Sequence, residues 1–176
     1  AGGRSRAVAA NPGQATDRRS PAWVQVKLVL ENSYSTPWSE QQPSHLPKHQ
    51  RHRWHQLQQL ADADGDGITT PQEARDGDAV RLLVEAGVPL MDDTEDGSSG
   101  SGLMHHKFVV VDDRSVITGS ANFTSSGLHG DAGRASTRGN VNHLLRIDST
   151  ALAAVFRGEF ERMWGDGPGG AKDSRF

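Results

Sequence analysis

Apolar residues along this chain follow two spacings, one typical of strands and the other of helices. Residues 108–111 form an unbroken apolar run, which predicts a strand buried on both faces, and residues 116–118 predict a strand that returns beside it. Residues 149–164 repeat apolar side chains at helical intervals, which predicts a helix packed on the core. Together these segments predict an α/β domain.

The outer parts of the chain give weaker signals. Asp78 and Gly87 stand where a cap and a stop are expected for a helix over residues 79–86. Residues 1–22 contain two prolines and no strand-like run, so we expect a poorly ordered N-terminal segment. Residues 165–176 are rich in glycine, and we expect a flexible tail there.

Composition and charge limit the function classes. The 176 residues suit one domain, and the absence of cysteine excludes disulfides and thiolate metal sites. No apolar stretch approaches the length of about 18 residues that a membrane-spanning helix needs. The net charge of −3 is uneven, with +5 over residues 1–58, −9 over residues 59–97 and +1 over the remainder. The basic stripe typical of duplex-binding proteins is therefore not evident.

Six polar or small residues at fixed spacing surround the two central strands. In chain order they are His105, Lys107, Asp112, Gly119, Ser120 and Asn122. His105 and Lys107 are two residues apart, so on a strand they share a face and place an imidazole beside an ammonium. Ser120 and Asn122 add small hydrogen-bond donors, and Gly119 lets the backbone approach a ligand. The pattern predicts a site that holds an anion next to a reactive imidazole.

This H-x-K-x4-D and G-S-x-N pattern resembles the phospholipase D superfamily. Three outer segments also look like family elements: a helix and strand at residues 80–90, an early strand at 23–35 and a late strand at 140–147. The resemblance implies a mixed β-sheet flanked by helices across residues 23–164. It also implies initial strands that have no match in residues 1–22, so we expect a sheet that lacks its first strands.

The resemblance further implies covalent catalysis on a phosphodiester. His105 would attack phosphorus to form a phosphohistidine, and a second histidine would protonate the leaving oxygen. Lys107, Ser120 and Asn122 would bind the phosphate oxygens, so no cofactor is expected for catalysis.

Two more positions support this site in our interpretation. Asp112 belongs to the catalytic motif, but it lies an odd number of residues after Lys107 and would face the other side of a regular strand, so we interpret it as organising the turn. Asn142 occupies the position of the family's glutamate, which supports the catalytic histidine. An asparagine can accept a hydrogen bond from imidazole but cannot stabilise its positive charge. Activity would therefore be lowered, unless another carboxylate substitutes.

The catalysis needs two histidines of this kind, whereas the chain has one motif. Either two copies pair across a two-fold axis or a missing half supplies a second motif, and we favour the homodimer if the chain stands alone. His106 shares the face of Phe108, opposite His105, so we interpret it as a packed or hydrogen-bonded residue.

The substrate class stays open at this point. Phospholipid is slightly favoured because the acidic balance offers no basic groove, and a nuclease is the alternative. A calcium-stabilised, non-catalytic binding module is a third hypothesis, motivated by Asn142 and by the unmatched first strands. A signal sequence could precede the first residue, so an exported or periplasmic protein is slightly favoured over a cytoplasmic one.

Residues 50–77 form an acidic insertion that contains the spacing of an EF-hand calcium loop. Its ligands would be the side chains of Asp62, Asp64, Asp66 and Glu73 and the backbone carbonyl of Ile68. Thr69 stands where an aliphatic residue is usual, so a solvated acidic linker is the alternative. If calcium binds, we expect a structural rather than a catalytic role.

Histidines recur at three- and four-residue steps just before this loop, as they would along one side of a helix. They are His45, His49, His52 and His55, and Lys48, Arg51 and Arg53 lie between them. We interpret the set as a solvated or phosphate-contacting basic face rather than a metal site.

Overall fold

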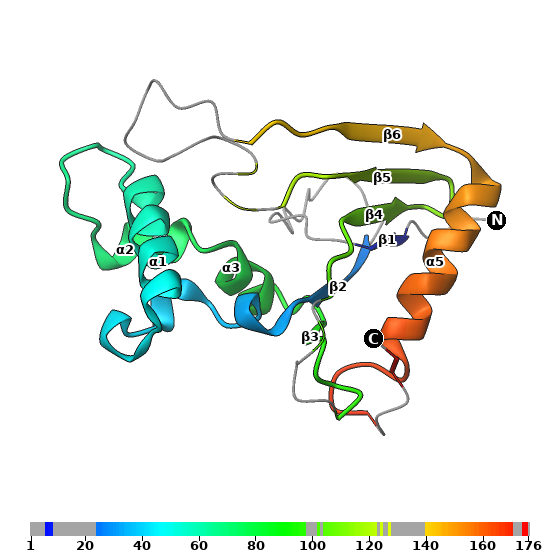
Figure 1. Ribbon diagram of the computed structural model, residues 1–176, viewed down its shortest axis with the longest axis horizontal. Helices are drawn as coiled ribbons and strands as arrows, with labels where there is room; N and C mark the ends of the chain where they lie inside the picture. Colours follow the sequence, from blue (N-terminus) through cyan, green and yellow to red (C-terminus); the bar gives the residue numbers. More distant parts are fainter. Residues whose placement is uncertain are drawn as a thin grey trace. The chain divides into compact units, whose positions relative to one another are not determined.

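A mixed sheet of six strands organises the described part of the computed structural model (Figure 1). The structure describes residues 6–8, 24–97, 104–122 and 140–170, together with Gly102, Thr124, Gly127, Ser174 and Arg175. The strands are β1 (Arg6–Val8), β2 (Gln25–Leu30), β3 (Leu90–Asp92), β4 (Phe108–Val111), β5 (Ser115–Gly119) and β6 (Leu144–Asp148). Their order is β3-β2-β1-β4-β5-β6, with β2 parallel to both neighbours and the remaining pairs antiparallel. The predicted mixed α/β architecture is confirmed.

Strand β1 corrects the expectation that residues 1–22 contain no strand. It pairs in parallel with β2 on one side and antiparallel with β4 on the other. Three residues are too few to show an alternating pattern in the sequence. The backbone groups of β1 instead bond to two strands that would each have an open edge without it, which explains why so short a strand forms.

The described helices are α1 (Lys48–Ala61), α2 (Pro71–Asp76), α3 (Ala79–Glu85) and α5 (Thr150–Trp164), with short 3-10 helices η1 (Asn32–Tyr34), η2 (Trp38–Glu40) and η3 (Pro43–His45). The chain divides into two compact units. The first unit, which contains the sheet and α5, comprises Ala1–Ser35, Leu83–Gly119 and Leu144–Phe176. The second unit, which contains α1 and α2, comprises Thr36–Leu82 and Ser120–His143.

Side chains of β2 point alternately to the two faces of the sheet, and each face has its own core. One cluster comprises Val26, Leu28, Leu83 and Val88. The other comprises Met91, Phe160 and Trp164, with Val29 packed against it. Because residues two apart on a strand share a face, Val26 and Leu28 fall in one cluster and Val29 in the other.

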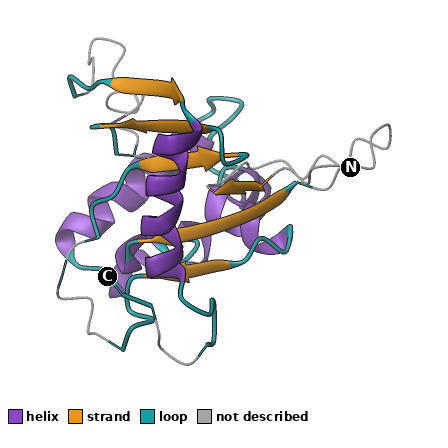
Figure 2. Ribbon diagram, turned by 90° about the vertical axis from the view of Figure 1, so that its right-hand side faces the viewer, coloured by secondary structure: helices purple, strands orange, loops and turns teal. Residues whose placement is uncertain are grey.

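Helix α5 crosses the sheet on the face of the second cluster (Figure 2). It begins after Ser149, whose hydroxyl oxygen accepts a hydrogen bond from the N–H of Leu152 (3.2 Å). Val110 of β4 and Val116 of β5 are buried against Ala153 of this helix. The even-numbered side chains of β4 therefore face α5, and the odd-numbered ones face away.

The described part of residues 165–176 is held against α5. Ser174 is buried, and the N–H of Arg175 donates to the carbonyl of Arg162 (2.9 Å). These contacts place Ser174 and Arg175 against the helix, and the flexible tail expected over residues 165–176 stays a prediction.

Candidate active site

His105 and Lys107 lie directly before β4, rather than inside a strand as predicted. The carbonyl of Lys107 accepts hydrogen bonds from the N–H of Gly119 (3.4 Å) and from Thr118 Oγ1 (2.9 Å). These bonds join the start of β4 to the end of β5. His105 and Lys107 therefore lie at the open end of the β4–β5 hairpin, opposite its turn.

The ammonium of Lys107 donates a hydrogen bond to the backbone carbonyl of His105 (Nζ–O 2.9 Å). Partial burial lowers the pKa of this ammonium, because fewer water molecules stabilise its charge. The His105 side chain is exposed. An exposed imidazole beside a partly desolvated cation can bind an anionic group and attack it.

His106 lies on the other face, as predicted. Its ring contacts Phe108 edge to face (5.8 Å between centroids), and its Nε2 lies 3.5 Å from Oε1 of Glu159 on α5. These contacts agree with the interpretation of His106 as a packed or hydrogen-bonded residue, although 45% of its side chain is exposed. His106 lies between His105 and Lys107, so its contact with Glu159 connects the segment 105–107 to α5.

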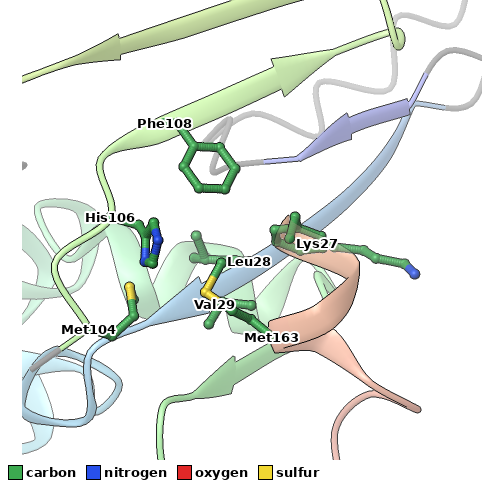
Figure 3. Close-up of a pocket in the computed structure, with 8 residues that line it drawn as sticks. Lys27, Leu28, Val29, Met104, His106, Phe108 and Met163 are labelled. Carbon is green, nitrogen blue, oxygen red and sulfur yellow. The ribbon is translucent and has the colours of Figure 1, made fainter. Parts of the chain in front are cut away.

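A small cavity borders His106 (Figure 3). It is lined by Lys27, Leu28, Val29, Met104, His106, Phe108, Phe160 and Met163. Its volume of about 40 Å³ leaves room for a few water molecules. The ammonium of Lys27 lies over the ring of Trp164 (4.8 Å) and is directed away from the other lining side chains (Figure 3).

Asp93 holds the other end of the motif segment, and the sequence reasoning missed it. Its side chain is buried and accepts hydrogen bonds from the N–H groups of Asn32 (2.9 Å) and Met104 (3.3 Å). Met104 directly precedes His105. The sequence signal for such a residue is faint, because a lone aspartate after a strand is common in turns.

Ser120 forms a hydrogen-bonded group with the segment that precedes β6. Its hydroxyl donates to Oδ1 of Asn142 (3.0 Å) and accepts from the N–H of His143 (3.1 Å). Nδ2 of Asn142 donates to the carbonyl of Gly127 (2.9 Å). The position of the family's glutamate is thus in contact with the predicted phosphate-binding serine, and Asn122 is exposed nearby in the sequence. Ser120, Asn122 and Asn142 belong to the second unit, whereas His105 and Lys107 belong to the first.

Asp112 lies in the β4–β5 turn, in agreement with its interpretation as a residue that organises the turn. Asp112 and Asp113 have φ angles of 54° and 53°, and the N–H of Arg114 donates to the carbonyl of Val111 (3.0 Å). Asparagine and aspartate tolerate this left-handed backbone better than most residues. The turn is at the far end of β4, about 16 Å from Lys107 at the usual rise of a strand.

The acidic loop between α1 and α2 brings three of its predicted ligands together. Carboxylate oxygens of Asp62, Asp64 and Asp66 all lie within 4.8 Å of one another. The loop wraps around them through backbone bonds, since Asp62 accepts from the N–H groups of Gly65 and Gly67 (both 2.9 Å). Such oxygen donors suit Ca²⁺.

Glu73 is not one of the three clustered carboxylates, and Ile68 contacts the cluster through its backbone N–H. Oε2 of Glu73 accepts from the N–H of Thr70 (2.8 Å) in the capping box of α2, and Oε1 accepts from the N–H of Ala63 (2.9 Å). Hydrogen bonds from the Thr70 backbone and hydroxyl lower the pKa of Glu73 to about 2. The Ile68 side chain is exposed, and its N–H donates to Asp66 (2.7 Å). A calcium ion would have to draw Glu73 away from part of this network.

Comparison with known proteins agrees with the motif. The family model described as "Cardiolipin synthase, PLD-like domain" matches residues 22–164. Three relatives are named mitochondrial cardiolipin hydrolase. The protein of Xenopus laevis is 35% identical over 101 residues, which are 57% of this chain and 39% of that protein. Those of Mus musculus and Homo sapiens are each 33% identical over 91 residues, 52% of this chain and 35% and 31% of their own lengths.

The chain thus spans well under half the length of these relatives. Their name also overturns the expected exported or periplasmic location, which is wrong because the relatives are mitochondrial proteins. That expectation had no positive signal behind it, since a chain without a visible leader fits several compartments. None of the helices among the described residues has both the length and the hydropathy needed to cross a bilayer.

Proposed function

Because the chain belongs to the family of phospholipase D-like domains of the cardiolipin synthase type, we propose that it is a phosphodiesterase that hydrolyses a phospholipid. The observation that carries this proposal is the Lys107 ammonium held 2.9 Å from the backbone of the exposed His105. A nucleophile and a phosphate-binding cation are thereby fixed on one short segment. The similarity to proteins named cardiolipin hydrolases favours a lipid of the cardiolipin class as substrate.

In the proposed first step, an imidazole nitrogen of His105 attacks phosphorus. The P–N bond forms as the bond to the leaving alcohol oxygen breaks, and a second histidine gives its proton to that oxygen. In the second step water attacks phosphorus, the second histidine takes a proton from the water, and the P–N bond breaks. One phosphodiester and one water become one phosphomonoester and one alcohol.

Charge on the phosphate oxygens would be neutralised by protein donors. Lys107 would exchange its neutral carbonyl partner for a phosphate oxygen, which is a stronger, charge-assisted hydrogen bond. Ser120 and Asn122 are the further proposed donors, and Asn142 orients Ser120 through the bond described above. These groups supply the electrostatic stabilisation of the transition state.

A second copy of the chain is the proposed source of the second histidine. One chain carries one H-x-K-x4-D motif, and two-fold pairing would place the two His105 residues at one shared site. A second motif in a longer protein is the other source, and the partial coverage of the relatives is compatible with it.

Turnover of bis(p-nitrophenyl) phosphate tests the proposed chemistry. Wild-type protein should release p-nitrophenol, and His105→Ala should reduce the rate by at least about a hundredfold. Val109→Ala, next to the motif, serves as the packing control. Equal rates for wild type and His105→Ala would refute the proposal and leave the non-catalytic binding module as the better reading.

Vesicles and nucleic acid then separate the two substrate classes. We expect phosphatidate to be released from cardiolipin vesicles, and we expect no cleavage of single-stranded DNA or RNA. Cleavage of nucleic acid alone would assign the chain to the nuclease alternative.

We also propose a structural calcium ion in the acidic loop, supported by the three clustered aspartates. Titration calorimetry should show binding in the wild type, loss in Asp62→Ala and weakening in Glu73→Gln. Asp76→Asn, an acidic residue of α2 outside the loop, should bind as the wild type does. Absence of heat in the wild type would identify the loop as a solvated linker.

A further inference from the structure

Basic side chains gather on one side of the first turns of helix α1. Lys48, Arg51, His52 and His55 recur at three- and four-residue steps and therefore share this side, and His49 borders it. All five side chains are exposed. We refer to Lys48, His49, Arg51, His52 and His55 as the basic face. No aspartate or glutamate occurs in residues 41–61.

The opposite side of α1 is the one that packs. Nε1 of Trp54 donates to the carbonyl of Trp38 (3.0 Å), and the two indole rings lie edge to face (6.2 Å between centroids). Ala61 is buried, and Gly77 lies so close to it that a side chain at Gly77 would collide with its methyl group. The helix is therefore anchored by its apolar side, and the basic face remains at the surface.

Within the described residues, nothing neutralises the basic face. Its five side chains form no ion pair and no side-chain hydrogen bond, although the ring of His55 contacts the ring of Trp54. The acidic side chains of the neighbouring helices have other partners. Glu40 of η2 pairs with Arg81 (3.5 Å), and Asp76 of α2 accepts from Gln72 (2.9 Å).

The remaining titratable neighbours do not change this balance. Glu73 of α2 is held in its capping box, and the aspartates of the acidic loop accept hydrogen bonds from their own backbone. Arg75 of α2 and His45 of η3, which packs against α1, add further basic groups. The basic face is thus a positive surface that is stabilised by packing on its far side.

We propose that the basic face docks on the surface of an anionic phospholipid bilayer. The inference rests on the proposed function, since a hydrolase of an anionic phospholipid has to work at such a surface. Clustered basic side chains on a helix are attracted to anionic headgroups. Nucleic acid is less suited, because the face presents no Phe, Tyr or Trp on which bases could stack.

The three histidines make this docking dependent on pH. Imidazole is the side chain whose charge most readily changes near physiological pH. Protonation of His49, His52 and His55 raises the formal charge of the basic face from +2, contributed by Lys48 and Arg51, to +5. Binding should therefore strengthen as the pH falls and weaken as salt screens the charges.

Vesicle co-sedimentation of the whole chain tests the proposal. The vesicles contain phosphatidylcholine with or without about a fifth of cardiolipin, in EDTA, at pH 5.5 and 7.5. Wild type should bind only the anionic vesicles, and more tightly at pH 5.5. Lys48→Glu with Arg51→Glu should weaken binding at least tenfold. The triple change of His49, His52 and His55 to Gln should remove the pH dependence.

Two controls make the outcome specific. Arg114→Glu with Arg175→Glu changes the net charge equally at exposed positions elsewhere and should bind as the wild type does. All variants should hydrolyse soluble bis(p-nitrophenyl) phosphate at the wild-type rate, so a failure of the proposed chemistry is seen separately. The proposal is overturned if the Lys48/Arg51 variant binds normally, if the control loses binding as well, or if the face binds single-stranded DNA but no vesicles.

Discussion

The ammonium of Lys107 donates a hydrogen bond to the backbone carbonyl of His105, the proposed nucleophile. Burial lowers its pKa, yet the ammonium has to stay charged to hold a phosphate. We expect Lys107→Met to reduce kcat/KM for bis(p-nitrophenyl) phosphate by about a hundred- to a thousandfold, the effect of removing one donor to a developing oxyanion. Lys107→Arg keeps the charge and should recover part of this loss.

The lowered pKa of Lys107 also predicts how the hydrolysis rate depends on pH. The rate should fall on the alkaline side at a lower pH than for an ordinary lysine, because the ammonium loses its proton earlier. In Lys107→Arg this alkaline decline should move upward, since guanidinium stays charged. A decline at the same pH in both proteins would show that Lys107 is not the titrating group.

His106 gives a second prediction at this scale. His106→Ala removes both the ring contact with Phe108 and the contact of Nε2 with Glu159. The segment from His105 to Lys107 should then lose its position, and turnover should fall between tenfold and a hundredfold. His106→Phe keeps the ring and should have an intermediate rate. A wild-type rate in His106→Ala would show that α5 does not position the segment.

Features of single residues could be predicted from the sequence where their cause was local. Alternation along the backbone predicted that His105 and His106 would face opposite ways, and it separated Asp112 from Lys107. The contact of Asp93 with Asn32 and Met104 could not be predicted, because it joins three segments that are distant in the sequence.

The short helix α2 depends on the pair formed by Thr70 and Glu73. The pKa of Glu73 is lowered to about 2 in the folded chain, whereas an unfolded glutamate titrates near pH 4.3. The ionised form therefore stabilises the fold, fully above about pH 4.3, and this contribution is lost as the pH falls towards 2. Hydrogen exchange of the α2 amides should accelerate over this window, relative to a reference peptide.

Two variants test whether the capping box is the cause. Glu73→Gln should show no such acid window. Thr70→Ala, which removes the N-cap hydroxyl, should destabilise α2 by about 1 kcal/mol and shift the window to higher pH. An unchanged window in Thr70→Ala would assign the acid sensitivity to another group.

Longer elements could be predicted from their own residues, whereas β1 could not. The unbroken apolar run predicted β4, the returning run predicted β5, and the helical repeat of apolar residues predicted α5. Strand β1 has no such pattern, and it exists because β2 and β4 offer bonding partners on both sides.

The resemblance to the phospholipase D superfamily, first made from six spaced residues, is confirmed by the match over residues 22–164. Location could not be inferred in the same way, because no residue pattern in the chain encodes it. The homodimer remains a proposal. A homodimer with a shared site predicts the activity of mixed dimers of wild-type and His105→Ala chains.

Coexpression of wild type and His105→Ala in equal amounts tests shared catalysis. If each site needs His105 from both copies, only dimers of two wild-type chains are active, and the preparation should retain about a quarter of full activity. If each chain works alone, about half should remain. Mixing the purified proteins without exchange of subunits serves as the control and should also give about half.

Strand β1 lies near the beginning of the sequence but in the middle of the sheet, so removing the first residues would divide the sheet. A protein cut back to residue 22, where the family match begins, would lose the three residues between β2 and β4. A two-stranded sheet of β2 and β3 and a three-stranded sheet of β4, β5 and β6 would remain. Each would have a newly exposed edge strand whose unpaired backbone groups can bond to other molecules. Such a truncated protein should scatter light and self-associate at concentrations at which the whole chain stays clear.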